Sequence, residues 1–177
     1  MKIYVYVDDN GKVEGWGSTP SENTLEFDVD ENHEILRNPF AFVVQDDKLV
    51  KDESEILRQM KLRKEAELNQ ACQDAIIAGF DYTIDGISYH FSFDLEAQLN
   101  FQGAENLFAK GVVNELTWTA QKDGEYTRIT ITPDLMNQLS LAIFKHKNDN
   151  ISKLRDVLLP QVEAATTVEE VQAIVWE

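Results

Sequence analysis

A stretch of 27 residues without glycine or proline constrains the fold more than any other feature of the sequence. Residues 52–78, DESEILRQMKLRKEAELNQACQDAIIA, consist largely of strong helix formers. Gly79 follows directly, and glycine is the residue best suited to the left-handed conformation that ends many helices. The sequence therefore predicts one long helix, with a different type of structure on each side of it.

The residues before this helix predict a small antiparallel β module. A run of β-branched and aromatic residues, KIYVYV, precedes Asn10-Gly11, a pair that favours a tight hairpin turn. Residues 25–29 alternate apolar and acidic side chains, and residues 40–50 indicate a second hairpin. Four or five short strands in roughly fifty residues make a thin core, so we expect this module to attach to another structure.

The residues after Gly79 predict a mixed domain that begins with a hairpin. Aromatic and polar residues alternate on both sides of an Asp-Gly pair at residues 85–86, and a second hairpin is predicted around the Asp-Gly pair at residues 123–124. Between them, residues 94–109 predict a helix with Asp94 as its N-cap. The side chains expected to face inward from this helix are Leu95, Leu99 or Phe101, and Leu107 or Phe108.

A long helix and a short one complete the expected domain. Thr132-Pro133 provides a cap and a first-turn proline for the long helix. Its inward stripe is predicted to be Leu135, Leu139, Ile143, Leu154, Leu158 and Val162, and Pro160 is expected to kink or interrupt it. Thr167 and Glu170 have the spacing of a capping box for the short helix that follows.

These patterns predict an α+β chain with three parts. They are a β-rich attachment module at residues 1–51, a connecting helix at residues 52–79, and an α+β domain at residues 80–177. In the last part, two β-hairpins are expected to pack with a long helix and a short C-terminal helix.

The connecting helix carries apolar residues at a spacing close to a heptad repeat. The residues that fit this spacing are Leu57, Leu68, Ala71, Ala75 and Ala78, and they form a candidate oligomer interface. Lys61 and Lys64 interrupt the seam. Two interpretations therefore stand side by side: an amphipathic helix that packs on its own C-terminal domain, or a coiled coil between subunits.

The segment ATTVEEVQAIVWE, residues 165–177, has a tryptophan, Trp176, at its penultimate position. Val171, Ile174 and Trp176 are candidate residues for docking this segment. We expect Trp176 to close the C-terminal domain by packing on the hairpins or the long helix, in preference to serving as a free binding peptide.

Composition excludes several classes of protein. The net charge of −16 argues against a nucleic-acid-binding protein, because phosphate binding needs a clustered basic surface. Cys72 is the one cysteine, which excludes an internal disulfide and a multi-cysteine zinc site. No apolar run approaches membrane-spanning length and no signal peptide is evident, so we expect a soluble, unexported protein without membrane insertion.

The sequence shows none of the common catalytic motifs. It has no glycine-rich phosphate loop, no G-x-S-x-G or H-E-x-x-H sequence and no paired cysteines. His90 and Asp94 could form an acid–base pair, but we expect His90 on the polar face of a hairpin and Asp94 at a helix cap. His146 is expected to be partly buried and hydrogen-bonded. We therefore predict no catalytic, cofactor-binding or metal-binding residues, and a protein that is not an enzyme.

From about residue 65 onward, a series of motifs follows in a fixed order: YHFSFD, LEAQLNFQGA, a strand tryptophan before DGEYTRITIT, an HK pair and EAATTVEEVQAIVW. This order resembles an uncharacterised domain at the C-termini of bacteriophage tail-fibre and tail-tip proteins. The matching positions are Gly79, Phe80, His90, Phe91, Asp94, Gln98, Asn100, Trp118, Gly124, Thr132, His146, Ala165, Thr166, Glu170, Ile174 and Trp176. The opening MKIYVYVDDNGKVEGWGS is similar to the start of short proteins encoded among phage tail genes.

The resemblance implies a non-enzymatic structural component of a phage tail tip, baseplate or fibre, or of a phage-tail-like bacteriocin, that acts in assembly and host attachment. The expected partners are other tail proteins, including the receptor-binding protein, and further copies of the chain, with a trimer favoured. The expected location is a virion tail or tail-like particle, after synthesis in the bacterial cytoplasm. Two alternatives are a fibre-assembly chaperone and a carbohydrate-binding adhesin with Trp16, Tyr89 or Trp118 as sugar platforms.

Overall fold

The structure is a computed structural model that describes all 177 residues, and it divides into two compact units. The first unit comprises residues 1–64 and 165–173, and the second comprises residues 65–164 and 174–177. Helix α1, Glu53–Ile77, contributes to both units. The architecture is α+β with small antiparallel sheets, as the sequence predicts.

The first unit contains five strands before α1, within the four or five that the sequence predicts. Strands β1 (Lys2–Val7), β2 (Val13–Gly17) and β3 (Thr24–Asp28) form an antiparallel sheet in the order β2-β1-β3, and β4 (Phe42–Gln45) pairs with β5 (Lys48–Lys51). Both predicted hairpins are therefore confirmed.

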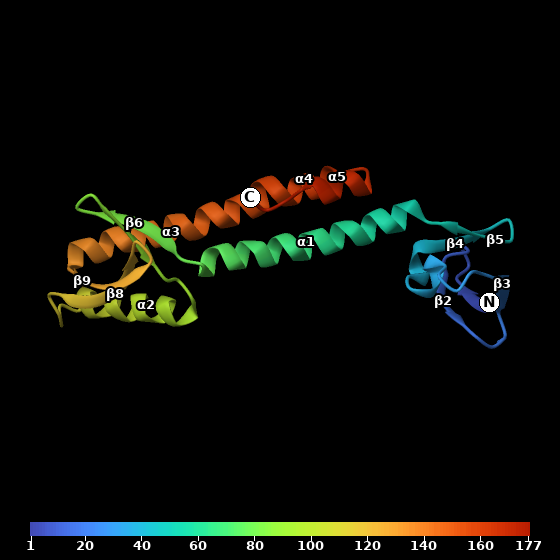
Figure 1. Cartoon of the computed structure of the whole chain (residues 1–177), viewed down its shortest axis with the longest axis horizontal. Coiled ribbons are helices and arrows are strands. Elements are labelled where there is room, and N and C mark those ends of the chain that lie inside the picture. The colour runs from blue at the N-terminus through green and yellow to red at the C-terminus, as the bar shows by residue number, and fades with distance from the viewer. The chain divides into compact units, whose positions relative to one another are not determined.

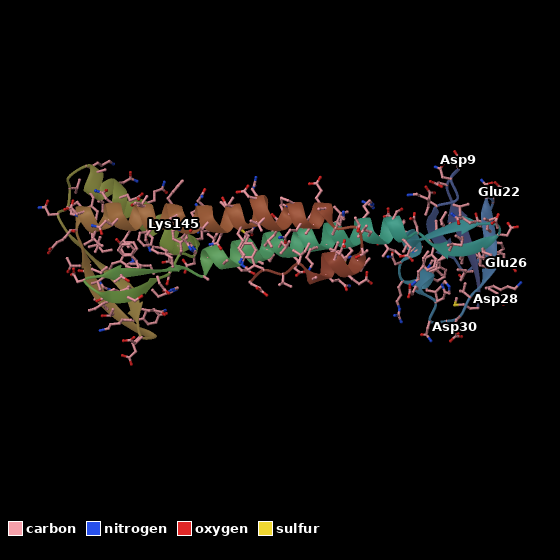
Figure 2. All side chains as sticks on the ribbon, turned by 90° about the horizontal axis from the view of Figure 1, so that it is seen from above. Asp9, Glu22, Glu26, Asp28, Asp30 and Lys145 are labelled. Carbon is pink, nitrogen blue, oxygen red and sulfur yellow. The ribbon has the colours of Figure 1, made fainter.

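The turns of this β module use residues that tolerate positive φ angles. Gly11 has a φ of +78°, and its carbonyl accepts a hydrogen bond from the backbone N–H of Val44 at 2.7 Å. The β1–β2 hairpin is thus tied directly to the β4–β5 hairpin. In Figure 2, five acidic side chains extend outward from the module: Asp9, Glu22, Glu26, Asp28 and Asp30.

The core of the module is small and mainly aliphatic. Its buried members are Ile3, Val5, Val13, Val29, Ile35, Ala41 and Phe42. Helix α1 begins where the Asp52 carboxylate accepts a hydrogen bond from the backbone N–H of Glu55 at 3.1 Å. Ile56, in the first turn of α1, packs on the same core, so the start of the long helix belongs to the module.

The second unit contains a four-stranded antiparallel sheet with two helices packed on it, in addition to the later part of α1 and the helical segment up to Ala164. Strands β6 (Phe80–Ile84), β7 (Ile87–Phe91), β8 (Leu116–Lys122) and β9 (Glu125–Ile131) lie in chain order. Helices α2 (Leu95–Ala109) and α3 (Pro133–Ser152) complete the arrangement shown in Figure 1. Both predicted Asp-Gly hairpins and both predicted helices are confirmed.

Both helices pack on one face of this sheet. The strands alternate, and their inward residues form one core with residues of α2 and α3. The buried members are Phe80, Phe91, Phe93, Phe101, Ala104, Ala120, Ile131, Met136 and Leu139. The rings of Phe80 and Phe91 are stacked with their centroids 5.5 Å apart, so the core is aromatic where that of the β module is aliphatic.

The inward face of α2 differs in part from the prediction. Phe101 and Ala104 are buried and Phe108 is partly buried, at spacings of three and four residues. Leu95 is 72% exposed and Leu99 is 61% exposed, so the expectation that Leu95 faces inward is wrong. The ring of Phe101 packs at a tilt against Trp118, with centroids 4.5 Å apart, and this contact favours the observed rotation of the helix.

The long helix is interrupted as Pro160 predicts. Thr132 caps α3 by accepting a hydrogen bond from the backbone N–H of Leu135 at 3.3 Å. A π-helical turn, Lys153–Leu158, follows α3 and leads into α4, Leu159–Ala164. Because Pro160 has no N–H to donate to the preceding turn, it disfavours a regular α-helix there.

The C-terminal segment has the predicted cap and the predicted packing. Helix α5, Val168–Ala173, begins with Thr167, whose hydroxyl accepts a hydrogen bond from the Glu170 backbone N–H at 3.2 Å, while Glu170 accepts one from the Thr167 backbone N–H at 3.2 Å. Ile174 and Trp176 then pack against a second cluster of the second unit. Its buried members are Leu68, Cys72, Leu154, Leu158 and Val162.

Candidate functional site

Two histidines meet the carboxyl end of α1 within the second unit. The Nε2 atom of His146 lies 3.0 Å from the carbonyl oxygen of Ile76, and the Nε2 atom of His90 lies 3.0 Å from that of Ala78. The last carbonyls of a helix have no partner within the helix. Both imidazoles therefore act as caps, and the expectation that His146 is partly buried and hydrogen-bonded is confirmed.

His90 also contacts Asp81 on the neighbouring strand and not Asp94. Its Nδ1 atom lies 2.8 Å from the Asp81 carboxylate. A neutral imidazole has one N–H and can donate to only one of these two acceptors. Asp94 instead accepts a hydrogen bond from the backbone N–H of Ala97 at 2.8 Å and caps α2. The structure thus places His90 and Asp94 in separate structural roles, as the sequence predicts.

Gly79 allows this close approach. It has a φ of +98°, and a Cβ atom at this position would lie 2.2 Å from the carbonyl oxygen of Phe91 and 2.8 Å from Nε2 of His90. Any other residue would collide with the strand and displace the histidine cap. The end of α1 is therefore a fixed joint between the helix and the hairpin of its domain.

Many positions that carry the phage-tail resemblance have structural roles of this kind. Gln98 donates from its amide to the carbonyl of Phe93 at 3.0 Å, and Thr166 and Glu170 hydrogen-bond to one another at the start of α5. Asn100 is different, because it is exposed and lines a groove. Packing and capping thus account for several of these positions, whereas packing does not explain Asn100.

The groove beside Asn100 lies between α2 and the free side of β8. Strands β7 and β8 pair only at His90 and Gln121, because the chain leaves β7 to enter α2, whereas β8 and β9 pair along their full length. The groove has a volume of about 580 Å³ and its lining includes Leu99, Asn100, Trp118, Asp94 and Glu96. It combines apolar walls with carboxylates, which suits an extended peptide better than a small anion.

A second groove lies between the edge strand β6 and α3. It has a volume of about 670 Å³, and its lining includes Tyr82, Gln138, Leu141 and Lys145. The Tyr82 hydroxyl donates to the Gln138 side chain at 2.8 Å and forms part of the wall. Neither groove could be found from the sequence, because each depends on where neighbouring elements diverge.

The candidate oligomer interface on α1 has a mixed environment. Leu68 is fully buried and packs with Cys72, Leu154 and Leu158 of its own chain. The other candidates are Leu57, Ala71 and Ala75, which are half-buried, and Ala78, which is exposed. Packing within the chain thus accounts for Leu68, and a role of the remaining four residues between subunits stays a prediction.

The candidate docking residues at the C-terminus are packed. Val171 is fully buried, and Trp176 and Ile174 lie against the second cluster of the second unit. The Lys153 ammonium group lies 4.6 Å from the centre of the Trp176 ring, within the range of a cation–π interaction. Trp176 therefore closes its domain by contacting the π-helical turn that follows α3.

Other side chains with reactive or ring chemistry are part of the packing. Burial raises the pKa of the Cys72 thiol, which keeps it protonated and unreactive. No group of three histidine, cysteine or acidic side chains is arranged to hold a metal ion. Trp16, Tyr89 and Trp118 are partly buried against the cores of their units. None of the helices is both long enough and apolar enough to cross a bilayer.

Comparison with known proteins identifies the family of the C-terminal part. The model of the family described as Domain of unknown function (DUF4376) matches residues 59–175. The chain belongs to this family. No curated protein and no solved structure matches it. The matched residues include most of α1, the four-stranded sheet and all the later helices, whereas the β module lies outside the match.

Proposed function

We propose that this protein is a non-enzymatic structural component of a bacteriophage tail tip, baseplate or fibre, or of a phage-tail-like bacteriocin. The observation that carries the proposal is the ordered series of motifs between Gly79 and Trp176. Many of these residues belong to the cores, caps and turns between β6 and the C-terminal segment, which supports treating the motifs as one connected series. The protein acts by binding other proteins during assembly and host attachment.

The surface of the second unit supports a role in assembly. Several large apolar side chains are exposed on an otherwise acidic chain, among them Leu95, Leu99, Leu141 and Phe144. Exposed apolar patches on a monomer commonly mark surfaces for other proteins. The β module, with its thin core and outward acidic side chains, is the part that we propose attaches to another tail protein.

Quantitative mass spectrometry of purified particles tests this proposal. A structural component is expected at a fixed copy number relative to the major tail proteins, and particles made without it should lack a tip or fail to adsorb to cells. An assembly chaperone, which the same exposed apolar residues would also suit, is expected at substoichiometric levels or not at all. Normal particles in the absence of the gene would contradict both roles.

A further inference from the structure

One face of α3 is apolar, exposed and regular. Asn137, Leu141, Phe144, Asn148 and Ile151 follow one another at steps of four and three residues, and we name this row the α3 ridge. Leu141 is 70% exposed, Phe144 67% and Ile151 38%. Met136 and Leu139 enter the core from the other side of the helix, so the ridge faces solvent.

We propose that the α3 ridge is the surface through which a second copy of this chain associates, with the two α3 helices parallel and in register. Alternating steps of four and three are the spacing of a coiled-coil seam. In a parallel pair, each apolar side chain of the ridge would meet its own counterpart in the second copy: Leu141 meets Leu141, Phe144 meets Phe144 and Ile151 meets Ile151. Asn148 would meet Asn148, and two facing amides can hydrogen-bond only when the helices are in register.

The distribution of charge distinguishes this surface from the rest of the chain. Four of the seven basic residues after residue 80 lie between residues 141 and 155, where Asp149 is the single acidic residue. On a chain with a net charge of −16, most other surfaces would bring carboxylates together when two copies meet. Few carboxylates therefore meet along the ridge, and the basic side chains of one copy need acidic partners on the other.

A carboxylate beside the ridge provides charge complementarity. Ser140 flanks the ridge and donates a hydrogen bond to the Glu105 carboxylate, which holds this acid next to α3. In a parallel heptad arrangement, Ser140 faces Lys145 of the second copy. Within its own chain Lys145 pairs with Asp149, and an exposed pair of this kind is weak enough to be exchanged. Glu105 can thus pair with Lys145 of the second copy.

The size of the ridge limits the strength of the contact. Its five residues span roughly 21 Å at 1.5 Å per residue. A seam of this length buries less surface than the area of about 800 Å² that each partner buries in a standard interface. We therefore expect association that increases with protein concentration. The inference deepens the proposed function by naming where copies meet, and it rests on that function only for its biological setting.

Sedimentation velocity of the full chain over a wide concentration range tests the contact. The mass should rise with concentration, and the paired substitutions Leu141→Glu and Phe144→Glu should weaken association by at least about tenfold, because each places a charge in the seam. The matched control is Leu95→Glu with Leu99→Glu on α2, where the leucines are equally exposed. A monomer at every concentration, or an equal effect of the control, would overturn the proposal.

Two further variants test the register. Glu105→Lys or Lys145→Glu alone should weaken association roughly two- to fivefold, as for other surface ion pairs, and the two changes together should restore it. Asn148→Cys should form a disulfide between copies on mild oxidation, whereas Gln102→Cys on the exposed side of α2 should not. An unrestored double variant together with no Asn148→Cys crosslink would rule out the parallel contact.

These measurements are independent of the test of function. A chain that remains monomeric but occurs at fixed copy number in particles would overturn the ridge contact and leave the proposed function intact. A chain that associates through the ridge but is missing from particles and unnecessary for them would overturn the proposed function and leave the ridge contact intact.

Discussion

The β module and the α+β domain reach stable cores by different routes. Ile3, Val5 and Ile35 fill the module with aliphatic side chains, and its turns depend on acidic and glycine residues. The domain is built around Phe80 and Phe91, with histidine and threonine side chains as helix caps. Aliphatic cores accept many substitutions of similar volume, whereas stacked rings and specific caps accept few.

This difference agrees with the extent of the family match. The family match covers residues 59–175 and leaves out the β module. An aromatic cluster requires particular ring sizes, and a cap requires a particular polar atom, so both features restrict the residue types at their positions. A thin aliphatic sheet requires only alternation, which many unrelated sequences share.

Deleting one core side chain from each region gives the largest expected effects. Phe91→Ala should lower the free energy of unfolding by about 4 kcal/mol, and Ile35→Ala by about 3 kcal/mol, because both side chains are fully buried. Hydrogen-exchange mass spectrometry should show loss of protection mainly in residues 80–131 for the first variant and in residues 1–51 for the second. If either variant reduced protection equally in both regions, the two cores would not be independent of one another.

Two glycine substitutions test whether the close packing at the end of α1 constrains the domain. Gly79→Ala should destabilise the protein by about 3 kcal/mol, because the new methyl group collides with the Phe91 carbonyl at a positive φ angle. Gly103→Ala is the control, since no atom lies near its Cβ position and alanine favours the interior of α2 by about 1 kcal/mol. Urea denaturation should show a lower free energy of unfolding for Gly79→Ala and a higher one for Gly103→Ala. If neither substitution changed the stability, the role of the fixed joint would be refuted.

Trp176→Ala tests whether the C-terminal segment belongs to the core of the domain. The half-buried ring and its contact with Lys153 predict a loss of about 2 kcal/mol. Val175→Ala, at the exposed neighbouring position, should change stability by less than about 0.5 kcal/mol. An unchanged thermal midpoint for Trp176→Ala, together with loss of partner binding, would favour a free binding peptide instead.

The smallest expected effect concerns the acidic start of α1 in the first unit. Hydrogen bonds from Arg58 and then Gln59 lower the pKa of Glu55 from 4.5 to about 2. Its contribution to stability is therefore complete above pH 4.5 and is lost as the pH falls toward 2. Glu55→Gln should remove this pH dependence and cost under about 1 kcal/mol at neutral pH. Thermal melts of both proteins at several pH values measure the difference, and parallel curves would contradict it.

Local signals were sufficient to predict most elements of the fold. Asn10-Gly11, the two later Asp-Gly pairs, Gly79 and the Thr132 cap each specify a backbone conformation from a few neighbouring residues, and the structure confirms them. Pro160 likewise predicts an interruption that the structure shows as a π-helical turn. These features depend on steric limits within a turn, so the sequence alone carries the information.

The rotation of the helices and the shape of the surface could not be predicted in the same way. Helix α2 is apolar on more than one side, and the contact of Phe101 with Trp118 decides that Leu95 is exposed. The α3 ridge and the grooves likewise depend on which faces the sheet covers. His90 and His146 have no sequence signal for capping α1, because their acceptors lie 12 and 70 residues away along the chain.

The π-helical turn at Lys153–Leu158 also sets the direction in which the side chains of α4 point. Leu154, Leu158 and Val162 are spaced four residues apart, and in a regular α-helix two such steps would rotate the third side chain by about 80° from the first. The wider turn takes up part of this rotation, which keeps all three side chains buried. A one-residue deletion within the turn would therefore rotate Val162 relative to Leu154, and Val162 would no longer point into the cluster against which Trp176 packs.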